Sequence, residues 1–162
     1  MVSGTPAALS AYSAANKSDI PVIFCAVSDP VAAGLTESLE AGYNNCNGTS
    51  DILDFSAQVD LIQSIQPDVK KIGVLYTTTE ANSMSQLESF KAVCTEKGIE
   101  VVDQGVSGAA DIPQAATTLA SQVDCINNFT DNNVVNNLSI VLEKANAANI
   151  PVYGSEIEQV KN

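Results

Sequence analysis

The sequence contains no histidine, no arginine and no tryptophan. Without histidine, the commonest acid–base side chain is missing, and Ser–His and Cys–His nucleophile pairs are excluded. Without arginine, no bidentate guanidinium is available for phosphates or bases. Seven lysines and 19 acidic residues give a formal net charge of -12, which repels a phosphate backbone. Conventional hydrolase chemistry and nucleic-acid binding are therefore disfavoured.

Long apolar runs and a signal-peptide pattern are also missing. No stretch approaches the roughly 18 consecutive apolar residues of a membrane-spanning helix. The chain also does not open with the charged region followed by an apolar region that is typical of a signal peptide. Apolar residues make up 45% of the composition, which suffices for a core and argues against disorder. A length of 162 residues fits one domain, or one domain and part of another.

Phosphate-binding glycine loops and metal-ligand spacings are absent as well. No G-x-G-x-x-G, G-x-x-x-x-G-K-[ST] or C-x-x-C pattern occurs, so we expect no nucleotide, metal or other cofactor. Cys25, Cys94 and Cys125 lie in apolar segments and are expected to be buried thiols. Cys46 lies in a polar, asparagine-rich stretch and is expected to be loosely placed. We expect no disulfide framework.

What the sequence does contain is an alternation of helix and strand patterns. Apolar residues in 82–97, for example, recur at spacings of three and four opposite charged residues. The order predicts an α/β fold with a doubly wound, mostly parallel sheet. Helices are predicted over residues 5–17, 30–40, 56–66, 82–97, 111–121 and 132–148, and strands over 21–27, 47–52, 71–76, 99–103, 123–128 and 151–153.

Three of the predicted strands end in a cluster of small polar residues that opens a helix. These strands are 71–76, 123–128 and 151–153. In a parallel sheet such ends lie on one edge, where helix N-termini face a common crevice. We therefore expect the functional site at this edge.

A polar stretch rich in turn-forming residues, 41–48, is interpreted as a connection between two lobes. We predict that residues 1–42 are the last part of a first lobe and that 43–162 are most of a second lobe. About 40 residues are too few for an independent α/β domain. We expect the exposed strand edges of an incomplete first lobe to favour self-association.

Several segments match one known family in order and spacing across nearly the whole chain. They are Gly4-Thr5-Pro6-Ala7-Ala8, Ile20-Pro21-Val22-Ile23-Phe24 followed by Val27-Ser28-Asp29-Pro30-Val31, Gly48-Thr49-Ser50-Asp51, Lys71-Ile72-Gly73-Val74-Leu75-Tyr76, Glu80-Ala81-Asn82-Ser83, Thr130-Asp131-Asn132 and Ile150-Pro151-Val152-Tyr153-Gly154-Ser155-Glu156. In these segments the chain resembles the ABC-transporter substrate-binding proteins of the tryptophan/tyrosine type, which have the type I periplasmic-binding fold. The segment Asn127-Asn128-Phe129 departs from the resemblance, because the family strand before Thr130 is more apolar.

The resemblance implies a non-enzymatic solute-binding component of an ABC importer, which is extracytoplasmic and either lipid-anchored or periplasmic. Its implied partners are a small amphipathic ligand, with an aromatic amino acid favoured, and a membrane permease. Family members carry an export signal and more of lobe one before the Gly-Thr-Pro element, and a returning segment at the other end, so the resemblance implies a fragment. A ligand-sensing domain of a transcription regulator or receptor on the same fold is the alternative, which flanking domains would distinguish.

Candidate ligand-binding residues come from the polar clusters. Asn82 and Ser83 either cap a helix or leave its first N–H groups for a ligand carboxylate. Asp131, between Thr130 and Asn132, either starts a helix or binds a ligand ammonium group.

Asp29 has the same two interpretations, as a cap or as a ligand contact, and the resemblance adds Thr5 from the lobe-one side. For the remaining candidates a solvated loop position is the alternative. These are Ser50, Asp51, Glu80, Ser155 and Glu156.

Overall fold

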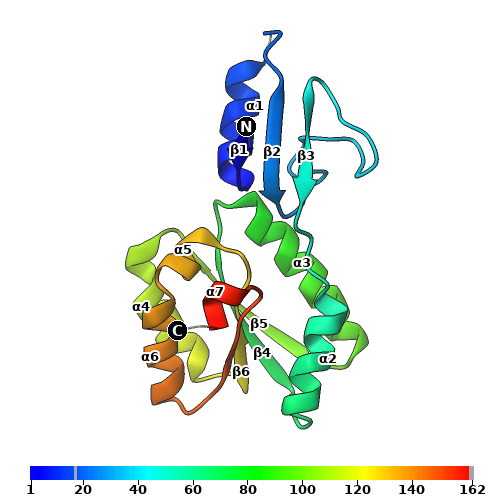
Figure 1. Ribbon diagram of the computed structural model, residues 1–162. Coiled ribbons are helices and arrows are strands. Elements are labelled where there is room, and N and C mark those ends of the chain that lie inside the picture. The colour runs from blue at the N-terminus through cyan, green and yellow to red at the C-terminus, as the bar shows by residue number, and fades with distance from the viewer. Residues whose placement is uncertain (17, 161–162) are drawn as a thin grey trace.

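The computed structural model describes residues 1–16 and 18–160, which form two units (Figure 1). The smaller unit has a parallel sheet of order β1-β2-β3. Helix α1 packs on this sheet around Ala8, Phe24 and Val27. The elements of the smaller unit are β1 (Val2–Ser3), α1 (Thr5–Ala15), β2 (Val22–Val27) and β3 (Cys46–Ser50).

The larger unit has a parallel sheet of order β5-β4-β6-β7. All three of its strand pairs are parallel, as the alternation of helix and strand patterns predicts. Its elements are α2 (Phe55–Ile65), β4 (Lys71–Thr77), α3 (Ala81–Glu96), β5 (Glu100–Val106), a 3-10 turn (Ala109–Asp111), α4 (Ile112–Ala120), β6 (Cys125–Asn127), α5 (Asn132–Asn136), α6 (Leu138–Ala147), β7 (Val152–Tyr153) and α7 (Ile157–Val160).

Helices cover both faces of the larger sheet (Figure 1). On one face, α4 and α6 pack against Leu75 and Ile126. On the other face, α2 and α3 enclose Phe55, Phe90 and Phe129, whose ring centroids lie 5.4 to 5.5 Å apart. Such ring pairs add to the stabilisation that apolar burial supplies. The predicted doubly wound sheet is therefore confirmed.

The two sheets divide after β3. Val27 of β2 pairs with Ser50 of β3, so the smaller sheet extends to Ser50. The chain then enters the larger unit through residues 51–54. The predicted lobe boundary between residues 42 and 43 thus lies inside the smaller unit.

Two predicted helices differ from the structure. Residues 30–40 form turns and bends instead of a helix, because Gly34 takes φ +71° and ends the first turn after Pro30. The predicted helix 132–148 is divided into α5 and α6 at Asn137, whose φ of -117° is not helical.

The cysteines also differ in part from the expectation. Cys46 is only 1% exposed and belongs to the core of the smaller unit, whereas Cys25 is half-buried. Cys94 and Cys125 are fully buried as expected, and burial raises the pKa of each thiol to about 12. All four thiols are free.

No helix in the described ranges 1–16 and 18–160 is long and apolar enough to cross a membrane.

Candidate functional site between the two units

The carboxyl ends of β4, β6 and β7 lie on one edge of the larger sheet, because these strands are parallel and adjacent. The prediction that their polar clusters share an edge is therefore confirmed. This edge faces the smaller unit, since β2 points toward it and Ser28, just after β2, contacts Thr130, which follows β6 (Figure 1). A crevice between two sets of strand ends is the usual ligand position in open α/β sheets.

Asp131 is fully buried at this edge, and both of its carboxylate oxygens accept hydrogen bonds from the chain itself. Oδ2 accepts from the Thr77 N–H and the Ser83 hydroxyl, both at 2.6 Å. Oδ1 accepts from the Thr77 hydroxyl at 2.8 Å and the Val134 N–H at 3.0 Å. With every oxygen occupied, Asp131 is a helix cap and a cross-link, and the expected contact with a ligand ammonium has no free acceptor here.

Glu80 is 9% exposed and its carboxylate is held from one side only. Oε2 accepts from the Asn132 N–H at 3.3 Å, the Asn132 amide at 2.8 Å and the Asn82 amide at 3.4 Å. No donor in the described part of the chain reaches Oε1, which stays accessible to solvent. The same charge lies at the N-termini of α3 and α5, where helix dipoles favour an anion. Glu80 thus presents one fixed, free carboxylate oxygen.

The first turn of α3 has no side-chain cap. Its leading N–H groups therefore have no partner within the helix and are available to an acceptor. Asn82 and Gln86, on the same helix, are 3% and 4% exposed, and their side-chain oxygens have no partner among the described residues. Buried amide oxygens are normally hydrogen-bonded. The start of α3 therefore lacks polar partners that a ligand or water would supply.

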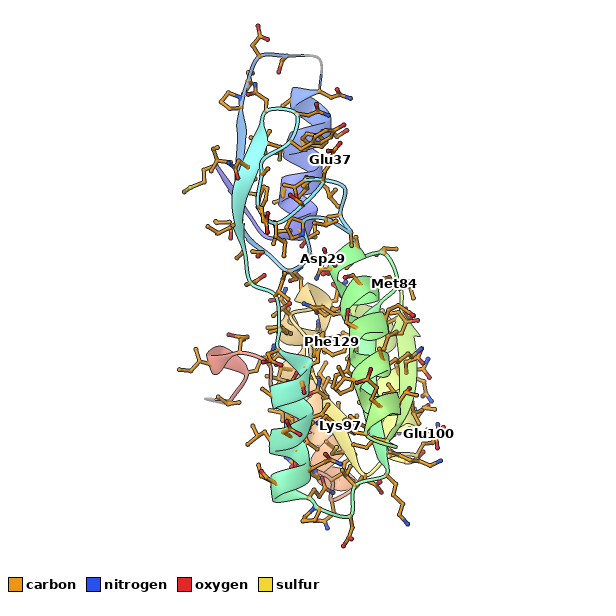
Figure 2. The ribbon with its side chains drawn as sticks, turned by 90° about the vertical axis from the view of Figure 1, so that its right-hand side faces the viewer. Asp29, Glu37, Met84, Lys97, Glu100 and Phe129 are labelled. Carbon is orange, nitrogen blue, oxygen red and sulfur yellow. The ribbon has the colours of Figure 1, made fainter. Side chains whose placement is uncertain are left out.

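Thr130 and Asp29 connect the two units. The Thr130 hydroxyl accepts from the Gln86 amide at 2.8 Å and lies 3.2 Å from the Ser28 hydroxyl. Asp29 accepts from the Ser85 hydroxyl at 2.7 Å, and Figure 2 shows it where the smaller unit meets the start of α3. Its other oxygen caps the turn at the Ala32 N–H.

Glu156 lines a cavity of about 210 Å³ together with Thr130, Asp131 and Asn132. This cavity adjoins Oε2 of Glu80, because Asn132, which lines the cavity, donates a hydrogen bond to that oxygen. The volume is below the roughly 300 Å³ at which small-molecule pockets begin. It therefore corresponds to one wall of a site.

The remaining predicted site residues lie elsewhere or are already engaged. Thr5 is 3% exposed at the start of α1, which packs near α3. Ser155 bonds to the Asn128 carbonyl and to the Gln58 amide, so it holds the end of β7 against α2. Ser50 ends β3 and Asp51 follows it. Both are exposed, and no contact in the described residues joins them to Glu80.

Charge is distributed unevenly between this edge and the rest of the larger unit. Glu80, Asp131 and Asp29 gather at the crevice. The described lysines lie elsewhere, at the start of β4, on α3 and at its end, and in the last turn of α6, and four of them form ion pairs. These pairs are Lys71–Glu100, Lys91–Asp103, Lys97–Asp60 and Lys144–Glu143. A crevice of this sign attracts an ammonium group.

Ser28, Thr77, Ser85 and Gln86 take part in the site and were not among the predicted residues. Gln86 had a readable signal, because it occupies a buried position in the apolar stripe of 82–97, where a polar side chain needs a partner. The roles of Ser28 and Ser85 depend on contacts between units and have no such signal.

The family of ABC transporter substrate binding proteins matches residues 1–162. The chain belongs to this family. A protein named tyrosine-binding protein, from Clostridioides difficile (strain R20291), is 41% identical over 152 residues, which are 94% of this chain and 44% of that protein.

Two solved structures are similar to this substrate-binding chain. The ABC domain in complex with L-Trp from Streptococcus pneumonia is 35% identical, with a TM-score of 0.93 over 99% of this chain and 55% of that chain. The ligand-free, open structure of a substrate-binding protein with adhesive properties from Clostridium difficile is 36% identical, with a TM-score of 0.71 over 99% of this chain and 54% of that one. This chain spans about half the length of these relatives, and the type I periplasmic-binding fold is confirmed.

Proposed function

We propose that this chain forms one side of the ligand cleft in the solute-binding protein of an ABC importer for an aromatic amino acid. The family, the relative named for tyrosine and the similar structure with L-Trp support this proposal. The protein binds and delivers its ligand without catalysis, outside the cytoplasm, to a membrane permease. The rest of the cleft belongs to a part of the relatives that this chain does not match.

In this proposal the smaller unit is the last part of lobe one and the larger unit is most of lobe two. The two solved relatives have nearly equal identity and coverage, yet their TM-scores are 0.93 and 0.71. Sequence divergence does not account for that difference, whereas a change in the angle between two units does. The units of this chain have the arrangement of the L-Trp complex, and hinge motion between them is the transport-related change.

The free Oε1 of Glu80 is the observation that carries the assignment of the ligand ammonium. Three donors hold the other oxygen, so the acceptor is already oriented before a ligand arrives. The ammonium donates to Oε1, and the ligand carboxylate accepts from the uncapped N–H groups of α3. The carboxylate-rich crevice discriminates against acids that have no ammonium group.

The proposal is tested with the full-length importer protein that contains this chain. Calorimetric titrations compare L-tryptophan, L-tyrosine and L-phenylalanine with indole-3-propionate, which has the indole and carboxylate of tryptophan but no ammonium. We expect the wild type to bind an aromatic amino acid and to reject indole-3-propionate. Glu80→Gln should weaken amino-acid binding by about 1.5–3 kcal/mol, the scale of a hydrogen bond to a charged group.

Glu88→Gln is the matched control, because Glu88 is an exposed acid on the same helix. We expect this variant to bind as the wild type does. Failure of all three amino acids to bind would contradict the proposed function. Binding with unchanged preference for tryptophan over indole-3-propionate in Glu80→Gln would contradict only the role of Glu80.

A further inference from the structure

Two consecutive residues of the smaller unit make polar contacts to two different elements of the larger unit. Asp29 accepts a hydrogen bond from Ser85 of α3 at 2.7 Å. Ser28, which is 6% exposed, lies 3.2 Å from the Thr130 hydroxyl in the loop after β6. The sequence separations are 56 and 102 residues, so neither contact belongs to a local turn.

Two of the groups that meet across the crevice, the Asp29 carboxylate and the Thr130 hydroxyl, are oriented within their own units. The second oxygen of Asp29 accepts from the Ala32 N–H at 2.9 Å. The Thr130 hydroxyl accepts from the Gln86 amide at 2.8 Å, and its carbonyl accepts from the Asn82 amide at 3.3 Å. Groups that are already ordered lose little conformational freedom when they pair, so the contact retains most of its free energy.

These contacts do not use the proposed ligand groups. The free oxygen of Glu80 takes part in neither contact, and Asp29 has both oxygens engaged by Ala32 and Ser85. The Asp29 carboxylate therefore connects the smaller unit to α3.

We infer that Ser28 and Asp29 form a latch with Thr130 and Ser85 that holds the two units in the arrangement of the liganded relative, without touching the ligand. The latch sets the fraction of molecules that are closed, and so the apparent affinity of the cleft. The inference rests on the proposed function only in that the two units open and close.

The test measures the orientation of the two units in this chain without any ligand. Backbone residual dipolar couplings give an alignment tensor for each sheet separately. In the wild type we expect β1–β3 and β4–β7 to share one tensor. In the double variant Ser28→Ala, Ser85→Ala we expect two distinct tensors, while amide chemical shifts inside each sheet stay unchanged and exclude unfolding.

Two further variants separate the latch from general effects of serine removal. Ser89→Ala, one turn further along α3, removes an exposed hydroxyl that makes no hydrogen bond in the described structure, and it should keep the single tensor. Ser85→Thr retains the hydroxyl donor at this position and should keep the single tensor. One shared tensor in the double variant, or two tensors in the wild type, would overturn the latch.

The ligand titrations stay independent of this result. If the tensors separate while no amino acid binds the full-length protein, the latch holds and the proposed ligand class fails. If the full-length protein carries the latch substitutions, we expect weaker amino-acid binding, by roughly three- to tenfold for each of the two hydrogen bonds lost.

Discussion

Thr77 donates both its backbone N–H and its hydroxyl to Asp131, at 2.6 and 2.8 Å, across 54 residues of sequence. This double contact joins the end of β4 to the start of α5. It uses one donor for each carboxylate oxygen, and Ser83 and Val134 complete the set. The polar edge of the larger unit is thus organised around a buried carboxylate that accepts four hydrogen bonds from the chain itself.

Asp131→Ala should destabilise the protein strongly. The substitution leaves the buried donors of Thr77, Ser83 and Val134 without an acceptor, and we expect a loss of about 3–5 kcal/mol in the free energy of unfolding. Urea unfolding measures this change. Asp54→Ala is the comparison, because Asp54 caps α2 through one bond, to the Ala57 N–H, and should cost only about 1 kcal/mol. Equal losses for both variants would contradict the cross-linking role.

Asp124 makes the protein sensitive to acid. Its carboxylate accepts from the N–H groups of Lys70 and Lys71, both at 2.8 Å, and these bonds lower the pKa of the carboxyl. A lowered pKa contributes stability above the unfolded value of about 3.9, and that stability is lost as the pH falls through the folded pKa. Asp124→Asn should therefore lose less stability than the wild type as the pH falls from 5 to 2. Equal losses of unfolding free energy in the variant and the wild type over this pH range would contradict the assignment.

The cysteines should react in an order set by burial. Cys94 and Cys125 have pKa values near 12 and no exposure, so neither presents a thiolate at pH 8. We expect iodoacetamide to modify half-buried Cys25 first and to reach Cys94 and Cys125 only after denaturation. Peptide mass spectrometry reads out each site. Modification of Cys125 as fast as Cys25 in the folded protein would contradict the buried position.

This chain alone should bind aromatic amino acids weakly. One wall of a cleft leaves much of the ligand side chain in water, so we expect dissociation constants no tighter than about 1 mM, equivalent to about -4 kcal/mol. The edge of the smaller sheet is expected to favour self-association. Calorimetry with tryptophan, tyrosine and phenylalanine, together with light scattering, measures both. A monomer that binds one of them at micromolar affinity would contradict this prediction.

The alternation along the chain was sufficient to predict the sheet. Apolar runs at 71–76 and 123–128, each followed by small polar residues and a helical stripe, specify parallel strands whose ends meet. Such patterns are reliable because they reflect local periodicity and which face of an element is buried. The predicted helix at 30–40 failed for a local reason, since the left-handed conformation of Gly34 ended it after one turn.

The choice between Asp131 and Glu80 depended on tertiary structure. Both are acids beside a helix start. The sequence alone left Asp131 with a capping and a ligand interpretation, and Glu80 with a solvated-loop and a ligand interpretation. Three-dimensional contacts gave Asp131 donors from β4, α3 and α5, and left Glu80 one free oxygen.

The sequence by itself determined the α/β class, the parallel order and the edge where the polar residues gather, because these depend on the spacing of residues along the chain. Only the tertiary structure decided which polar groups pair across that edge. Asp29 meets Ser85 and Ser28 meets Thr130 because two sheets approach each other, and the partner of a side chain is set by what folding brings within about 3 Å of it, not by its neighbours in sequence.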